Sequence, residues 1–329
     1  MSNPALGCGN QSRSLQPVGC SVIIVNWNAG SQLRQCVDSV LTSGGGYVHQ
    51  IVVVDNASTD GSREAVEDCD DVRLIVASEN LGFAAACNRG ARQAESTYLL
   101  FLNPDTRVNQ ESFSVPLAFM ERPENADIGI CGIQLIDAQQ GISRTCARFP
   151  TLGRILASAL GIDKVPGFKA AGIHMADWDH GDSRPVDHVI GAFFLMRREL
   201  FDAVDGFDER FFVYLEDLDL SRRARDAGWQ CWYLTGTQAF HAGGGTSRQV
   251  KTKRLFYSLR SRLLYGFKHL PPWEAWVLVG VTAIIEPVTR SLYCLARGDG
   301  ADLRHTWSAY RMLWRGMGRI VRGKGRFEP

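Results

Sequence analysis

The stretch Ile51-Val52-Val53-Val54-Asp55-Asn56-Ala57-Ser58-Thr59-Asp60-Gly61-Ser62 decides the fold of this chain. Its four β-branched residues are typical of a strand that is buried on both faces. The polar residues after Asp55 form a turn that starts a helix, so the strand ends at Asp55. A buried strand followed by such a turn indicates a parallel α/β sheet.

Similar units lie on both sides of this stretch. We expect buried strands at residues 21–25, 51–54, 72–76 and 98–102, with helices at 31–41, 62–68 and 84–93 between them. This alternation predicts a doubly wound, mostly parallel sheet with helices on both faces. Ligands bind such a sheet outside the carboxyl ends of its strands, so the polar groups there are the candidates for a site.

The composition limits the function classes. The chain has 329 residues and a net charge of +1, so no overall charge favours a nucleic-acid partner. Its nine cysteines lack any CxxC pair, which argues against a zinc cluster or a disulfide framework and fits a reducing, cytoplasmic compartment. Residues 1–19 are polar without the apolar stretch of a signal peptide, so we expect a disordered tail there.

Beyond this tail we expect two parts. Residues 20–269 form the α/β domain, with a nucleotide-binding half at 20–137 and an acceptor and catalytic half at 188–269. Between the halves, residues 141–187 have no periodicity and are expected to form a variable excursion or lid. In the second half we expect an apolar run at 188–197, a helix at 218–227 and a strand at 229–234. Residues 270–329 form a C-terminal amphipathic helical region.

Two carboxylates follow strands of the first half. Asp55 would sit at a strand tip, where it could accept hydrogen bonds from a base or a ribose. The residues after it also make an ordinary turn, and both interpretations stay open. Asp105 follows Asn103-Pro104 after the fourth strand, and a carboxylate there suits a divalent cation that bridges phosphates. Alone, such a turn is usually only a turn.

The segment from Asn80 to Gly90 opens a helix and is rich in small residues. Gly82 would let the backbone approach either a ligand or a packed neighbour. The sequence contains neither GxGxxG nor the lysine of a phosphate-binding P-loop, so dinucleotides and ATP lack their usual binding loops.

The acidic run at the start of the second-half helix carries the candidate chemistry. Asp219 is explained by a pairing with Arg223 four residues on. Glu216 and Asp217 follow an aromatic run, which predicts a partly desolvated pocket. Adjacent helical residues diverge by roughly 100°, so one would be the base and the other a support. His241 precedes a glycine loop and is either a metal ligand or an ordinary packed histidine.

Together and in order, these residues resemble the inverting glycosyltransferase family 2, which has the GT-A fold, and its rhamnosyltransferase-like members in particular. The resemblance spans residues 20–269 and rests on residues 22–28, 53–62, 80–83 and 103–105, on Glu216-Asp217 and on His241.

The resemblance also implies roles for these residues. Asp217 is the general base with Glu216 beside it, Asp105 binds a divalent metal, Mg²⁺ or Mn²⁺, and His241 binds that metal or contacts the diphosphate. Asn103 stands where the family's DXD motif has its first acid, and Asp205 stands where many relatives have glycine. The residues implied in nucleotide binding are Asn26, Asp55, Asn80, Gly82 and Asn88.

The function implied is transfer of a sugar, with rhamnose the family-level candidate, from a nucleotide-diphosphate donor to a hydroxyl of a glycan or lipid-linked glycan in cell-envelope polysaccharide synthesis. A sugar-nucleotide nucleotidyltransferase is one alternative, although residues 26–30 lack the glycine- and arginine-rich phosphate loop that it needs. A non-catalytic sugar-nucleotide-binding protein is the other, although it would not need an intact Glu216-Asp217.

The C-terminal region is basic and aromatic. Six cations on an expected helix either bind a diphosphate or form a solvated face: Lys251, Lys253, Arg254, Arg260, Arg262 and Lys268. The apolar run 276–285 is shorter than the roughly 20 residues of a membrane span, and Glu286-Pro287 is expected to interrupt it. Aromatic residues then recur at helical spacing among arginines, which favours peripheral contact with the inner face of the cytoplasmic membrane over simple packing on the domain.

Overall fold

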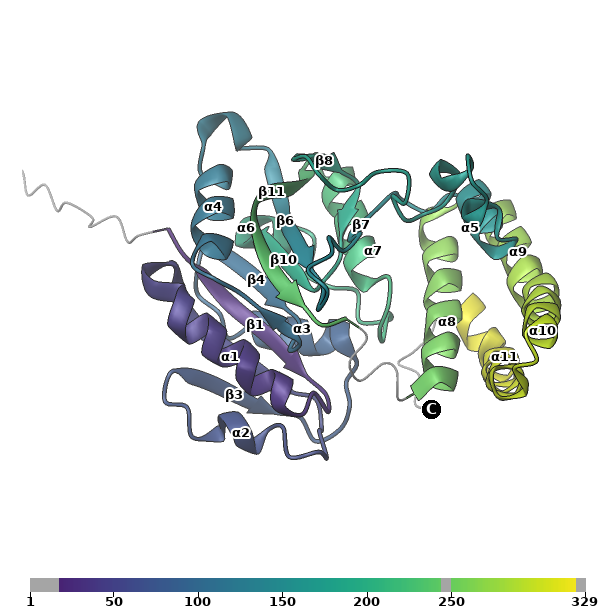
Figure 1. Cartoon of the computed structure of the whole chain (residues 1–329), viewed down its shortest axis with the longest axis horizontal. Coiled ribbons are helices and arrows are strands. Elements are labelled where there is room, and N and C mark those ends of the chain that lie inside the picture. Colours follow the sequence, from purple (N-terminus) through teal and green to yellow (C-terminus); the bar gives the residue numbers. More distant parts are fainter. Residues whose placement is uncertain (1–17, 244–249, 324–329) are drawn as a thin grey trace, which may run out of the picture.

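A computed structural model gives the structure of residues 18–243 and 250–323. Most of the tail expected at residues 1–19 lies outside the described residues. Figure 1 shows a sheet domain with helices on its faces and a lobe of helices beside it.

The parallel half of the sheet has the four strands that the sequence predicts, but β3 lies at its edge and is only partly buried, not buried as expected. Its strands lie in the order β3-β2-β1-β4, and the neighbours run parallel. Because all four run in the same direction, their carboxyl ends share one edge. The bounds are β1 Cys20–Asn26, β2 Val48–Asp55, β3 Val72–Val76 and β4 Tyr98–Leu102.

The other half of the sheet is mixed. Strand β10 lies between β4 and β6 and is antiparallel to both, while β11 runs parallel to β6. Short strands β5 and β8 pair antiparallel with β11, and β7 pairs with β9 in a second small sheet. The bounds are β5 Thr106–Arg107, β6 Ile128–Ile136, β7 Cys146–Ala147, β8 Arg184–Val186, β9 His188–Val189, β10 Phe193–Arg197 and β11 Gln230–His241.

Two of these strands differ from the expected bounds. The apolar run at 188–197 is divided into β9 and β10, with a bend at residues 190–192. The strand expected at 229–234 continues to His241. The bend and the long strand both bring the chain to the carboxyl edge of β4.

Helices cover both faces of the sheet. Alternate residues of β1 point to opposite faces, so Ile24 packs with α1 and α4 while Ile23 packs with α3 and α7. The bounds are α1 Ser31–Gly44, α2 Glu64–Glu67, α3 Phe83–Ala91, α4 Glu111–Met120, α6 Arg198–Ala203 and α7 Glu216–Asp226, with single 3₁₀ turns η1 Gly45–Tyr47 and η2 Pro123–Asn125.

The lobe beside the sheet domain has its own core. Helix α8 packs against α9 and α11 through buried aromatic and aliphatic side chains, and α5 of the excursion lies against α9 (Figure 1). The bounds are α5 Leu152–Ala159, η3 Ile162–Lys164, η4 Lys169–Ala171, α8 Lys251–His269, α9 Pro272–Gly280, the π-helical turn η6 Val281–Ile285, α10 Glu286–Ala296 and α11 Gly300–Val321.

The apolar run 276–285, which is by itself too short for a membrane span, lies within a longer helix that does not end at Glu286-Pro287. The helix runs unbroken over the 25 residues Pro272–Ala296, and by length and composition alone it could cross a membrane. Proline has no N–H to offer the carbonyl of Ala283 four residues earlier, and the indole N–H of Trp314 donates to that carbonyl instead. Glu286 is buried and forms ion pairs with Arg262 and Arg290.

Candidate functional site

Asp55 and Asn26 end neighbouring strands and bind each other. The Asn26 amide donates to Asp55 at 2.8 Å and to Ser62 at 2.8 Å, and the Ser58 N–H donates to the other Asp55 oxygen at 3.2 Å. The Asp55 side chain is 0 % exposed. In the free protein these side chains hold the turn 55–62 against the sheet, and their contact with a nucleotide stays a prediction.

Asn80 and Gly82 connect this turn to the second half of the domain. The Asn56 amide donates to Asn80 at 2.9 Å, and the Leu81 N–H donates to Asn56 at 2.7 Å. Gly82 has a φ of +84°, and a Cβ on it would lie 2.5 Å from the carbonyl oxygen of Phe212. Any larger residue would force this backbone contact apart, so the glycine is required by packing.

Asn88 binds the backbone of the turn before α7. Its amide donates to the Phe207 carbonyl at 2.8 Å and its oxygen accepts from the Phe207 N–H at 2.9 Å. Asp205, two residues earlier, has a φ of +59°. This left-handed conformation explains why glycine suits that position.

Helix α7 begins after an unusual backbone. Tyr214 and Leu215 have φ angles of +68° and +64°, which non-glycine residues rarely adopt. Each costs about 1–2 kcal/mol, and such conformations cluster at functional sites. The two residues turn the chain so that Glu216 and Asp217 open the helix at the sheet edge.

The carboxylate of Asp217 is oriented by two backbone N–H groups. Gly191, in the bend between β9 and β10, donates to one oxygen at 2.8 Å, and Leu218 donates to the other at 2.8 Å. The side chain is 18 % exposed. Asp217 is therefore a fixed carboxylate that a small hydroxyl can reach.

Glu216 has a different environment. It is 5 % exposed, and its Oε2 has no hydrogen-bond partner among the described residues. Burial, and next the negative charge of Asp217, raise the pKa of Glu216 well above its usual value. Burial and the nearby charge therefore favour the neutral form of Glu216, which suits a support of the base.

Asp105 and His241 form the candidate metal pair. Strand β5 pairs with the end of β11, which places His241 opposite Thr106, and the His241 Nε2 lies 3.3 Å from an Asp105 oxygen. Both side chains are mostly buried. The sequence predicts a strand that ends at residue 234, with His241 in the chain beyond it. In the structure His241 is instead the last residue of the longer strand β11.

The geometry of this pair fits a shared cation. Two ligands about 2.1 Å from one octahedral ion lie about 3.0 Å apart at neighbouring corners, close to the separation seen here. Within residues 18–243 and 250–323, no group of three or more His, Cys, Asp or Glu side chains is placed to hold a metal. Further ligands would have to be phosphate oxygens or water.

The acids of the two halves meet at one edge of the sheet. The carbonyl oxygen of Ala192 accepts from the Asn103 N–H at 3.1 Å and from Thr106 Oγ1 at 3.2 Å, while the neighbouring Gly191 N–H binds Asp217. The 103–106 turn is therefore hydrogen-bonded to Ala192, and Asp217 to the preceding residue, Gly191. Asp55 lies at the same edge, two strands from β4.

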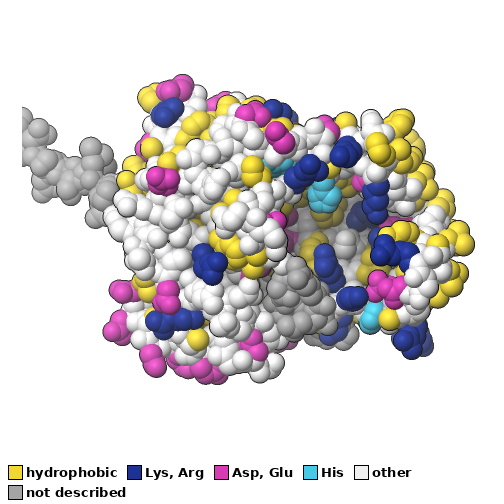
Figure 2. Space-filling view, viewed as in Figure 1, with side chains coloured by type: hydrophobic (Ala, Val, Ile, Leu, Met, Phe, Trp, Pro, Cys, Tyr) yellow, Lys and Arg dark blue, Asp and Glu magenta, His cyan; other side chains and the backbone are white. Residues whose placement is uncertain are grey.

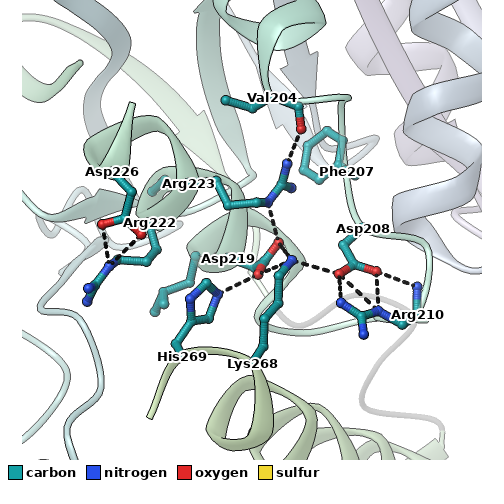
Figure 3. A network of polar contacts seen from close by, with 12 residues as sticks. Val204, Phe207, Asp208, Arg210, Asp219, Arg222, Arg223, Asp226, Lys268 and His269 are labelled. Carbon is teal, nitrogen blue, oxygen red and sulfur yellow. Dashed lines mark hydrogen bonds and ion pairs between the residues drawn. The ribbon is translucent and has the colours of Figure 1, made fainter. Parts of the chain in front are cut away.

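Asp219 is the centre of a buried ion-pair network (Figure 3). It pairs with Arg223 at 2.9 Å, as expected, but also with Lys268 and His269 of α8, each at 2.7 Å. Lys268 also binds Asp208 at 2.7 Å. Burial raises the pKa of Asp219, but the hydrogen bond from His269 and the charges of Arg223 and Lys268 outweigh it and lower that pKa.

The basic residues of α8 therefore bind mainly protein groups. Arg260 is buried and donates to the carbonyl of Arg210, Arg262 pairs with Glu286, and Lys251 pairs with Asp302. Arg260, Arg262 and Lys268 thus fit neither expected interpretation, whereas the pair of Lys251 lies on a solvated face. Lys253 and Arg254 are exposed.

Comparisons with known proteins agree with the resemblance. The family model "Glycosyl transferase family 2" matches residues 21–205. The chain is 26% identical over 279 residues, 80% of its length and 90% of the relative's, to the N-acetylglucosaminyl-diphospho-decaprenol L-rhamnosyltransferase of Mycobacterium tuberculosis. It is 28% identical over 177 residues, 53% of its length and 63% of the relative's, to the rhamnosyltransferase WbbL of Escherichia coli.

Solved structures share the fold. The mannosyltransferase PcManGT of Pyrobaculum calidifontis, in complex with GDP-Man and Mn²⁺, matches with a TM-score of 0.50 at 16% identity, covering 92% of this chain and 85% of that one. GalNAc-T7 with UDP, GalNAc and Mn²⁺ matches with a TM-score of 0.53 at 15% identity, covering 93% and 57%. The sheet domain thus has the GT-A fold.

Proposed function

The chain belongs to glycosyl transferase family 2, and from this we propose that it transfers a sugar from a nucleotide-diphosphate donor to an acceptor hydroxyl with inversion, Asp217 being the general base. One observation carries the assignment of the base. Asp217 is partly exposed and held by the Gly191 N–H, whereas the adjacent Glu216 is buried in surroundings that favour its neutral form.

The proposed reaction is one in-line displacement. The acceptor oxygen attacks the anomeric carbon while its proton passes to Asp217. The bond from that carbon to the diphosphate oxygen breaks, and its electron pair leaves with the nucleoside diphosphate. General-base assistance of this kind contributes about 10²–10⁴-fold to a rate.

Asp105 and His241 would hold Mg²⁺ or Mn²⁺. The bound ion would neutralise charge on the departing diphosphate. The support is the 3.3 Å pair of ligands at the sheet edge, together with the Mn²⁺ in the titles of two structures of the same fold.

The nucleotide would lie against the turn 55–62 and the segment 80–83. Asn26 and Asn88 use their amide groups on protein partners, so we assign them the task of holding these segments in place. Asp55, Asn80 and Gly82 would shape the surface that faces the base and ribose.

The acceptor we propose is a lipid-linked sugar, and the donor sugar L-rhamnose, in the synthesis of a cell-envelope polysaccharide. The support is the relative that matches 80% of this chain, whose name specifies L-rhamnose transfer to a diphospho-decaprenol-linked sugar. Figure 2 shows a hollow between the sheet domain and the helical lobe with Lys and Arg side chains at its margin, which suits a diphosphate.

Such an acceptor requires contact with a membrane, and we propose a cytoplasmic protein bound peripherally to the inner face. Trp273 of α9 is 64 % exposed. Figure 2 shows hydrophobic side chains along the outer edge of the lobe. The most exposed ones on α9, η6 and α10 are Trp273, Trp276, Ile284, Leu292, Tyr293 and Leu295. Monomeric soluble proteins rarely expose a large contiguous patch of this kind.

The excursion 141–187 adds to this surface, which its sequence did not predict. Leu160, Val165 and Phe168 are exposed around η3 and η4, with Lys164 and Lys169 between them. Apolar side chains that insert at the headgroup level, flanked by lysines that bind anionic lipid, are what a peripheral membrane contact requires.

A transfer assay tests the whole proposal. The full chain is incubated with nucleotide sugars and a short-chain polyprenyl-diphosphate N-acetylglucosamine, with Mg²⁺, Mn²⁺ or EDTA, and the product is identified by mass spectrometry and its anomeric configuration by NMR. We expect metal-dependent transfer with inversion. Donor binding without transfer to any acceptor would favour the non-catalytic alternative, and formation of a nucleotide sugar from a sugar phosphate would favour the nucleotidyltransferase.

A further inference from the structure

The structure places a buried histidine beside the proposed base. His188, in β9, is 3 % exposed, and its Nε2 lies 3.6 Å from the Asp217 oxygen that binds Gly191. In the sequence this residue is only the first member of an apolar run, and an imidazole is an unusual choice for such a position.

The hydrogen bonds of Ser221 assign the tautomer of this imidazole. Ser221 Oγ lies 3.0 Å from the carbonyl oxygen of Asp217, to which it can only donate. We assign this hydrogen to the Asp217 carbonyl, and with it there Ser221 Oγ accepts from His188 Nδ1–H at 3.0 Å. A neutral imidazole has only one N–H, and the lone pair of Nε2 therefore faces Asp217.

The surroundings favour the neutral ring. Burial is the largest effect and lowers the pKa of His188; the charge of His174 lowers it further, while the carboxylates of Asp217 and Asp187 oppose the shift. Two acceptors, Nε2 and a carboxylate oxygen, thus face each other without a hydrogen between them. One proton added between them would let one group donate a hydrogen bond to the other.

We propose that His188 and Asp217 form a proton-accepting pair, in which the proton taken from the acceptor hydroxyl is shared with His188 Nε2. This inference rests on the proposed role of Asp217 as the base. The proton arrives on the Asp217 carboxylate as the acceptor oxygen bonds to the anomeric carbon and the nucleoside diphosphate leaves with its electron pair. Nε2 then accepts a hydrogen bond, or the proton itself, and the pair releases the proton to solvent after the product departs.

The pair predicts more than a loss of rate. His188→Phe keeps a ring of similar size but offers no lone pair, so kcat should fall on the order of 10-fold to 100-fold, part of the effect of a general base, while the donor KM stays within about threefold. With Asp217 alone as base, the acidic limb of the kcat–pH profile should move to lower pH. His188→Gln, whose amide oxygen accepts a hydrogen bond but takes no proton, should give an intermediate kcat.

Two further variants separate this role from packing. Ser221→Ala frees the ring to carry its hydrogen on Nε2, so it should lower kcat although the imidazole is kept. His180 is the matched control, because it too is a buried histidine, bonded to the Cys146 N–H at 3.2 Å. His180→Gln should lower thermal stability and leave the pH profile unchanged.

The outcomes divide clearly. Wild-type kcat and pH profile in His188→Phe would overturn the pair while leaving the proposed function intact. A lower kcat with an unshifted profile, matched by an equal loss in His180→Gln, would also overturn it, since that is the result of a structural role. Wild-type turnover in Asp217→Asn would refute the proposed function itself.

Discussion

The ammonium group of Lys268 lies 2.7 Å from the carboxylate of Asp219, and this contact joins α8 to the helix that begins with the proposed base. Asp219 is fully buried and is also bound by Arg223 and His269 (Figure 3). Removing one partner of a buried pair leaves uncompensated charge, which is more costly than the loss of an exposed pair.

Asp219→Asn should therefore lower the free energy of unfolding by about 3–5 kcal/mol in urea titrations of the full chain. The control is Asp226→Asn on the same helix, whose pair with Arg222 is exposed, with an expected change of about 0–1 kcal/mol. The pKa of Asp219 is lowered in the folded state, so this stability is present above the unfolded pKa and is lost as pH falls below it. Equal effects of the two variants would contradict a buried network.

Asp217→Asn should reduce kcat about 10²–10⁴-fold while calorimetry shows unchanged donor binding, because the amide keeps the shape of the carboxylate but cannot take a proton. Asp226→Asn again serves as a control on α7 and should keep wild-type kcat. If both variants turn over normally, Asp217 is not the base.

Glu216→Gln should retain kcat within about threefold, because burial and the charge of Asp217 already disfavour the ionised form of the native side chain. The raised pKa also predicts a change in stability. The folded state keeps this proton above the unfolded pKa, so wild-type stability declines as pH rises through that value, whereas glutamine does not titrate. The variant should gain stability relative to the wild type as pH rises above the unfolded pKa in denaturant titrations. A difference in the free energy of unfolding that does not change with pH would show that folding does not raise the pKa of Glu216.

Asp105→Ala and His241→Ala should weaken metal-dependent binding of the nucleoside diphosphate, measured by calorimetry with and without Mn²⁺. Binding without metal should change little, because the proposed nucleotide contacts lie on the turn 55–62 and the segment 80–83. Unchanged metal dependence in both variants would remove these residues from the metal site.

The apolar edge of the lobe should bind lipid. Trp273→Ser and Phe168→Ser each remove an exposed apolar side chain, which corresponds to about 1.5–3 kcal/mol, or roughly 10-fold to 100-fold in partitioning to vesicles of anionic phospholipid. Val76→Ser is the control, because Val76 is exposed on β3 of the sheet domain. Equal sedimentation of all three variants with vesicles would exclude this surface.

The parallel half of the fold was predictable from sequence because its signals are local. Each strand of β1 to β4 is a short apolar run that ends in a polar turn, and the order of those turns carried the family resemblance. Helix α4 was missed because Pro116 lies inside it. The antiparallel position of β10 between β4 and β6 depends on pairing across the chain, which no local pattern records.

Long-range bonds also explain what was missed in the site. Asp105 and Asp217 were recognised by their motifs, but the bond from Gly191 to Asp217 and the position of His188 depend on the bend between β9 and β10. Likewise, Lys268 has the sequence context of a solvated or phosphate-binding lysine, and only the folded chain places it on Asp219. In the helix that contains Pro287, the Ala283 carbonyl accepts a hydrogen bond from Trp314, which lies 31 positions later in the chain.

The position of α8 limits how the protein can be divided. A shortened chain that ends at His269 would keep the residues that bind Asp219, yet it would expose the side of α8 that packs on Tyr310 and Leu313 of α11. Such a fragment would lose the exposed apolar edge of the lobe but expose the apolar side of α8. It would also weaken the attachment of α8 to α7, the helix that carries Asp217. Exchanging this lobe between relatives to change their membrane preference would therefore also disturb the helix that carries the proposed base.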